Sequence, residues 1–244
     1  RRYDIMIIDA SSLPYSALNE AVRGCGGQCR IIGCLGQRFI GAGLERGSIS
    51  ISGIPGNALG AYLNGAAIQV EGNAQDAVGD TMNAGSIVIH GSVGDAAGYA
   101  MRGGAIYIQG DAGYRAGVHM KAYGDRVPVM VIGGRAGSFL GEYQAGGRIV
   151  VLGLTGQERP IVGNFPCTGM HGGAVYLRSD CRDILFPGQV TARPAGPEDL
   201  AQIRPSVETF CHLFGQDAEE ILGAPFTVVT PDSQNPYRQM YVAN

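Results

Sequence analysis

The fold is decided by a stretch in the middle of the chain that occurs twice in succession. Residues 76–94 read DAVGDTMNAGSIVIHGSVG, and residues 95–110 repeat the pattern as DAAGYAMRGGAIYIQG. Within this stretch and on both sides of it, a glycine recurs every 19 residues, at Gly41, Gly60, Gly79, Gly98 and Gly117. Each copy also carries a short alternating apolar segment closed by another glycine. A fixed period of this length with one strand per copy is the signature of a solenoid.

The alternation within each copy defines an inner and an outer face. Ile87 and Ile89 share one face of a strand, and Val88 and His90 share the other. One such strand buries its apolar face only if copies stack, so we expect Ile68, Ile87 and Ile106 in one interior column. The chain has 40 glycines in 244 residues, and the period explains this excess as repeated sharp turns. A 19-residue coil does not match a triangular coil of three hexapeptides. The predicted fold is therefore an all-β, right-handed parallel β-helix.

The period divides the chain into three parts. Residues 1–27 precede it and are expected to cap the first coil with a strand over 3–8 and a helix over 12–23. Residues 28–180 form the predicted β-helix. Residues 181–244 are expected to add a helix over 197–214, interrupted by Pro205, a short helix capped by Asp217, and a polar tail.

Within the predicted β-helix, the period is interrupted twice. Arg30 and Ile32 lie one period before Ile49 and Ile51, which places them in the first strand's inner column. A four-residue insertion is expected within 121–128, so that Val129 and Val131 become the next inner pair. A seven-residue insertion is expected between residues 153 and 173, within 155–160 and 167–171. Insertions in solenoids form loops on one face and often make contacts.

Composition limits the classes of function. Charged residues make up 16% of the chain and the net charge is −3, which argues against nucleic acid as a partner. No apolar run is long enough for a transmembrane helix, and the start has no signal-peptide pattern. Six dispersed cysteines are typical of reduced thiols, so a cytoplasmic location is expected. The sparse charge suggests that other subunits, or further copies of this chain, cover part of the surface.

Three cysteines near the start allow two interpretations. Cys25, Cys29 and Cys34 have the spacing C-x3-C-x4-C, and thiolates at such positions bind metal ions or iron–sulfur clusters. The spacing matches no strong ligand motif, and Cys34 falls where a closing glycine is expected. We therefore favour small apolar residues packed in the first coil.

The remaining candidates are acids and histidines. Asp76 and Asp95 lie one period apart, either as a carboxylate pair for acid–base chemistry or, as we favour, as turn residues in one column with Asn57 and Ser138. His90 is expected on a solvated face, whereas His119 and His171 lie in or beside insertions and are candidate contact residues. No P-loop or single dinucleotide-binding fingerprint is present. We expect no catalytic, cofactor-binding or metal-binding residues.

Three segments resemble a known repeat family. Residues 72–79, 103–108 and 141–153 are similar to the G-x-G-x-G repeats of the C-terminal domain of the glutamate synthase large subunit, a family that includes the β-helix subunit of formylmethanofuran dehydrogenase. The resemblance covers about residues 28–180. It implies a β-helix without catalytic residues that braces a glutaminase domain and a flavin domain. The family's iron–sulfur cysteines lie in the flavin domain, so they do not transfer to the three cysteines above.

The resemblance favours one function over two others. We expect a non-catalytic scaffold subunit of a glutamate synthase-like oxidoreductase complex, which bridges a glutaminase subunit and an FMN and iron–sulfur synthase subunit. The first alternative is the β-helix subunit of a molybdenum or tungsten formylmethanofuran dehydrogenase. The second is an autonomous enzyme that uses the face with Asp76 and Asp95.

Overall fold

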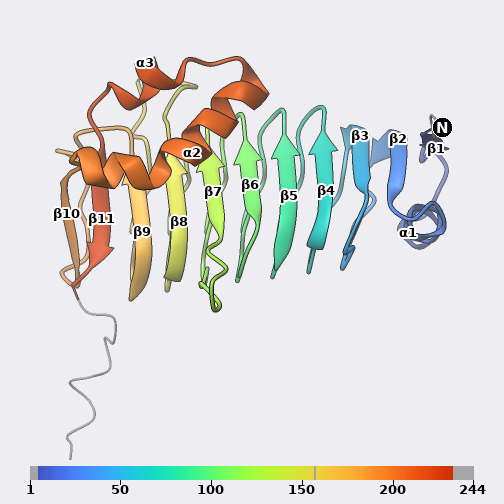
Figure 1. The fold of residues 1–244 in the computed structure, drawn as a ribbon, viewed down its shortest axis with the longest axis horizontal. Helices are drawn as coiled ribbons and strands as arrows, with labels where there is room; N and C mark the ends of the chain where they lie inside the picture. The colour runs from blue at the N-terminus through green and yellow to red at the C-terminus, as the bar shows by residue number, and fades with distance from the viewer. Residues whose placement is uncertain (1–4, 157, 233–244) are drawn as a thin grey trace, which may run out of the picture.

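The computed structural model describes residues 5–156 and 158–232 as one long coil with a helix laid across it (Figure 1). The helices are α1 (Tyr15–Gly24), α2 (Pro197–Phe214) and α3 (Ala218–Leu222). The strands are β1 (Met6–Asp9), β2 (Gln28–Leu35), β3 (Ser48–Ile54), β4 (Asn64–Val70), β5 (Ala84–Ile89), β6 (Ala105–Ile108), β7 (Val129–Ile132), β8 (Ala145–Val151), β9 (Gly172–Leu177), β10 (Val190–Pro194) and β11 (Thr227–Pro231).

Successive coils stack in register, and this confirms the predicted all-β parallel β-helix. Each strand from β1 to β8 pairs in parallel with the next one along the chain, so the parallel series ends at β9. Ile68 pairs with Ile87, and Ile87 pairs with Ile106, so one residue type forms a continuous column. All three side chains are at most 1% exposed. The interior of the coil is therefore a cylinder of stacked aliphatic side chains, whose burial supplies the main stabilising free energy.

The recurring glycine is required by both its backbone conformation and its neighbours. Gly79 has φ of +69°, and a Cβ there would lie 2.5 Å from Cδ1 of Ile106 on the next coil. Gly60 has the same relation to Ile87, at 2.6 Å. In the last coil the position is taken by Cys167, also with positive φ, at 62°. Among the described residues the sheet has no further parallel coil beyond β9, so the Cβ of Cys167 meets no strand isoleucine there.

The predicted register is wrong by one residue at two strands. In β2, Cys29 and Ile31 pair with Ile49 and Ile51, so they take the inner positions predicted for Arg30 and Ile32. A register shift after Ile31 restores the alignment of Cys34 with Gly53, as predicted.

The second difference lies at β7. Met130 and Ile132 pair with Ile106 and Ile108, so the insertion has five residues rather than four, and Val129 and Val131 face outward. The extra length forms a small hairpin closed by an antiparallel bridge between Tyr123 and Arg126. Because side chains alternate, an error of one residue exchanges the two faces of a strand.

The seven-residue insertion is located more narrowly than predicted. Ile149 pairs with Val175, which is 26 residues later and so confirms the seven extra residues. Ala136 already pairs with Val162 at the same spacing, so the whole insertion precedes residue 162. Residues 167–171 are therefore an ordinary part of the coil and not an insertion.

The N-terminal segment extends the sheet by one strand. β1 pairs with β2, and α1 packs Leu18 and Val22 against the end of the interior. The helix begins at Tyr15, after Pro14 as its N-cap, and not at Ser12 as predicted. Asp9 accepts hydrogen bonds from the backbone and hydroxyl of Ser11 instead, which places Ser11 in the turn before the helix.

The C-terminal segment differs most from the prediction. α2 has the predicted bounds, but it continues through Pro205 and lies along the outer face of the sheet (Figure 1). Asp217 caps α3 as predicted, through bonds to the backbone of Glu219 and Glu220. β11 then pairs antiparallel with β9 on one side and β10 on the other. The sequence did not predict β10 and β11. Of the predicted polar tail, residues 233–244 lie outside the described part of the chain.

Candidate functional site

The two aspartates predicted to stack do stack, and their carboxylates are used within the fold. Oδ1 of Asp76 accepts a hydrogen bond from the backbone N–H of Asp95, and Oδ1 of Asp95 accepts one from Tyr114, both at 2.8 Å. Asn57 accepts the equivalent bond from Asp76, at 3.1 Å. One column of side chains therefore ties each turn to the next. This geometry fits the interpretation as turn residues.

A second polar column repeats this arrangement nearby. Asn73 accepts from the backbone of Ser92, Ser92 from Asp111, and Asp111 from Arg135, at 2.8 to 3.0 Å. In both columns, a side-chain oxygen of one coil accepts a hydrogen bond from a backbone N–H of the next coil. The polar residues at the turns thus serve the stacking of coils.

Of the three cysteines near the start, Cys29 and Cys34 are buried and Cys25 is partly buried against the core. Cys29 faces the interior, and burial together with the neighbouring thiol of Cys25 raises the pKa of Cys29 to about 12. Burial raises the pKa of Cys34 to about 11. Metal ligation requires the thiolate, which these environments disfavour. Within residues 5–156 and 158–232, no three His, Cys, Asp or Glu residues are grouped as a metal site.

The histidines have three different surroundings. His90 lies 3.0 Å from the side-chain amide of Gln69 and packs against the ring of Phe214, at 5.1 Å between centroids. The end of α2 therefore half-covers His90, which was predicted to be solvated. His119 stacks on Tyr143 at 5.3 Å. His171 lies beside a groove on the surface of the coil.

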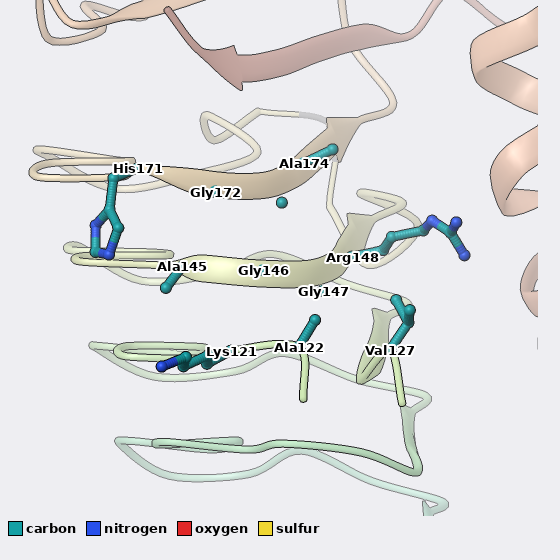
Figure 2. A pocket seen from close by; sticks show the side chains of 11 residues that line it. Lys121, Ala122, Val127, Ala145, Gly146, Gly147, Arg148, His171, Gly172 and Ala174 are labelled. Carbon is teal, nitrogen blue, oxygen red and sulfur yellow. The ribbon is translucent and has the colours of Figure 1, made fainter. Parts of the chain in front are cut away.

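This groove, of about 580 Å³, is the best candidate for a binding site (Figure 2). It runs across the starts of β8 and β9 and beside the five-residue insertion. It is lined by Lys121, Ala122, Val127, Ala145, Gly146, Gly147, Arg148, His171, Gly172, Gly173 and Ala174. The lining therefore combines a glycine floor with two basic side chains and an imidazole, and contains no carboxylate.

One column of the repeat explains the shape of the groove. Arg102, Lys121, Ala145 and His171 occupy equivalent positions, because each donates its backbone N–H to the coil before it at 2.7 to 3.0 Å. Ala145 therefore leaves a gap between Lys121 and His171. In Figure 2 the ring of His171 extends from its coil toward the coil of Ala145. The groove therefore forms where this gap adjoins two glycine pairs without side chains, Gly146–Gly147 and Gly172–Gly173.

The floor of the groove is held from inside by a buried amide. Gln144 is fully buried, in the interior column that Leu63, Met82 and Met101 occupy in earlier coils. Its Nε2 donates to the carbonyls of Gly146 and Gly147, each at 3.2 Å. Its Oε1 has no hydrogen-bond partner among the described residues. A polar side chain in an aliphatic column therefore lies directly beneath the groove.

Sequence reasoning missed this groove, although its signals are present in the repeat. Aligning the coils shows Ala145 among basic residues and Gln144 among Leu and Met. The insertion of five residues shifts the register just before β7, which obscured the alignment of Ala145 and Gln144 with the earlier coils. Of the lining residues, only His171 was predicted, as a contact residue.

The molecule is a parallel β-helix whose polar turn residues serve the stacking of coils. It belongs to the GXGXG motif family, because that family's model matches residues 16–231. The resemblance stated from the repeats is thereby confirmed. Among the residues that the structure describes, no helix is both long and apolar enough to span a membrane.

Two further comparisons identify similar proteins. The chain is 41% identical to Uncharacterized protein MJ1350 of Methanocaldococcus jannaschii, over 97% of this chain and 96% of that protein. It is also similar to a chain in the crystal structure of the formyltransferase/hydrolase complex FhcABCD from Methylorubrum extorquens, solved with methylofuran. That similarity has a TM-score of 0.60 and 22% identity, and covers 95% of this chain and 93% of the other. At this identity it shows a shared fold.

Proposed function

We propose that the chain is a non-catalytic scaffold subunit of a glutamate synthase-like complex. In this role it bridges a glutaminase subunit and an FMN and iron–sulfur synthase subunit, and it contributes no catalytic, cofactor-binding or metal-binding residue. It works in the cytoplasm, in glutamate biosynthesis.

The observation that carries the proposal is the interior of the coil. Its columns consist of aliphatic side chains, and among the described residues the buried polar side chains are Asn19, Gln144 and Thr227. Asn19 and Gln144 carry amides, which are neither acids, bases nor nucleophiles of the kind that catalysis uses, and the hydroxyl of Thr227 donates to the carbonyl of Ser179 at 2.8 Å. Asp76 and Asp95, the residues of the autonomous-enzyme hypothesis, bond the turns of neighbouring coils. The polar side chains of these turns therefore stabilise the stacking of coils, and we assign the function of the molecule to contacts made by its surface.

Membership of the GXGXG family supports the type of complex, because the family's repeats resemble the C-terminal domain of the glutamate synthase large subunit. A subunit role is also supported by the structural neighbour, which is itself one chain of a complex. The same neighbour favours one alternative. In that alternative this chain is the β-helix subunit of a molybdenum or tungsten formylmethanofuran dehydrogenase.

The test is purification of the tagged chain from its own cells, followed by mass spectrometry of the chains that accompany it. The proposal expects one glutaminase-like chain and one flavin-binding chain, and a glutamine-dependent synthase activity in the recovered complex that the isolated subunit lacks. Recovery of a molybdopterin-binding chain would favour the alternative. Recovery of neither set, or turnover by the isolated chain, would contradict the scaffold role.

A further inference from the structure

We propose that the groove at the starts of β8 and β9 binds an acidic peptide segment of a partner protein. The inference rests on the proposed role as a subunit, and it adds where and by what chemistry one partner is held. Two carboxylates of an extended segment would occupy the two ends of the groove, one between Lys121 and His171 and one at Arg148.

The basic groups of the groove are not neutralised by the fold. Within the described residues, neither Lys121 nor Arg148 lies within ion-pair distance of a carboxylate, whereas six other ion pairs form elsewhere on the surface. The chain as a whole is acidic, with a net charge of −3. Positive side chains gathered without counter-charges on an acidic protein favour an anionic partner and raise its rate of association.

The spacing at one end fits a single carboxylate. Lys121 and His171 belong to coils two apart, which corresponds to roughly 10 Å between their backbones at the usual spacing of parallel strands. Ala145 occupies the intervening coil and leaves this space open. Nδ1 of His171 lies 3.1 Å from the carbonyl of Gly169, which fixes the ring and leaves Nε2 for a ligand. Nδ1 must carry a proton to donate to that carbonyl, so Nε2 donates only from the doubly protonated ring. A carboxylate entering the gap can therefore accept hydrogen bonds from Lys121 on one side and from the imidazolium form of His171 on the other.

The other end is held by α2. A guanidinium nitrogen of Arg148 lies 3.0 Å from Oε1 of Gln202, a residue of α2, so the side chain is oriented by that helix. Figure 2 shows Arg148 extending away from the end at which Lys121 and His171 lie. The two ends of the groove are therefore separated along the strands, which suits two charges on an extended chain better than one compact anion.

Gln144 gives independent support for a binding site. An apolar residue occupies its column in the other coils and would leave no buried acceptor unsatisfied. An unpaired buried acceptor is costly to stability. The amide nevertheless holds the carbonyls of Gly146 and Gly147, which form the floor. A cost to stability directly beneath a groove is typical of a site kept for function.

The test measures binding of a fluorescein-labelled peptide of four Glu-Gly repeats to the full-length chain by fluorescence anisotropy. The same peptide with Gln in place of Glu is the matched ligand. We expect the Glu peptide to bind, the Gln peptide to bind at least ten times more weakly, and the affinity for the Glu peptide to fall as salt rises. The double variant Lys121→Gln/Arg148→Gln should lower the affinity at least tenfold.

Two further variants separate the groove from general charge. Ala145→Leu fills the gap without changing charge and should also lower the affinity at least tenfold. Arg46→Gln removes an exposed charge from an early coil, outside the groove, and should leave the affinity unchanged. Denaturation midpoints confirm that each variant is folded, and if Ala145→Leu does not fold, the double variant decides.

The proposal is overturned if the wild-type chain does not bind the Glu peptide, if both peptides bind equally, or if Arg46→Gln weakens binding as much as the double variant. Displacement of the peptide by phosphate or glutarate at the peptide's own concentration would overturn it in favour of a small-anion site. These outcomes are distinct from failure of the scaffold role. Partners can be recovered with a chain that does not bind the peptide, and the peptide can bind a chain that recovers none of the expected partners.

Discussion

The two halves of the sheet's outer face share a backbone and differ in what covers it. In the N-terminal half, one outer column consists of Arg30, Ser50 and Gln69, and it faces outward without a helix above it. In the C-terminal half the same column continues as Val88, Tyr107, Val131, Val150 and Tyr176, all at most 9% exposed. α2 lies over this second half and packs Phe210 and Phe214 on it (Figure 1).

The difference shows that the repeat specifies only the inside of the coil. Apart from Gln144, the inner columns described here are apolar along the solenoid, because every coil must bury them. The outer column changes from polar to apolar where the chain returns to cover it, and a second core forms between sheet and helix. The covered half is thus occupied within the molecule, which leaves the open half, the turns and the groove for partners.

The largest effect is expected from removing the centre of this second core. Phe210 is fully buried, and its ring lies over Gly133, where a Cβ would come within 2.6 Å of it. Phe210→Ala should lower the free energy of unfolding by about 3–5 kcal/mol, because it leaves a cavity that the rigid sheet cannot fill. Urea denaturation measures the loss. Glu208→Ala, on the exposed side of the same helix, is the control, and an equal loss in both variants would contradict the second core.

A reciprocal exchange within one column gives the next largest effect. Val150→Ser in the covered half should cost about 2 kcal/mol or more, because it removes apolar contacts and buries a hydroxyl. Ser50→Val in the open half should change stability by no more than about 0.5 kcal/mol. The urea denaturation midpoints of the two variants, each compared with that of the wild-type chain, measure these costs. Similar costs at both positions would mean that the halves do not differ in burial.

The smallest effect is expected at the ion pair of the open half. Glu71 lies 3.2 Å from Arg30 and accepts from the hydroxyl of Ser52 at 3.0 Å, with about half of its side chain exposed. Glu71→Ala should cost less than about 1 kcal/mol, because solvent and salt screen an exposed pair. Denaturation in low and high salt measures this cost. A loss above about 2 kcal/mol would show that this face is covered after all.

The sequence predicted what the period determines and failed where other contacts decide. The stacking of Ile68, Ile87 and Ile106 and the bounds of α2 follow from periodicity alone. The register of β7 was missed because Val129 and Val131 look like inner residues, whereas Val131 is buried by α2 on the outer face. β10 and β11 were missed because their pairing depends on the last coil being closed by a distant segment.

The candidate site was less predictable than the fold, because its shape depends on positions that lack a large side chain. Ala145 and the glycine pairs matter because of the side chains they lack beside Lys121 and His171. Such a gap is visible only once the coils are aligned in three dimensions. The aspartates and cysteines were recognised from the sequence, and their packed or bonded environments agree with the interpretations favoured for them.

Amide hydrogen exchange, compared between the free chain and the complex purified from its own cells, tests the account most directly. We predict that α2 and the strand residues directly beneath it exchange equally slowly in both states, since they are already buried within the molecule. These strand residues are Val88, Tyr107, Val131, Val150 and Tyr176. New protection should appear in the open half, at the turns or at residues 121–127 and 171–174 beside the groove. Faster exchange of α2 in the complex would mean that the helix leaves and a partner takes its place, which would contradict the account.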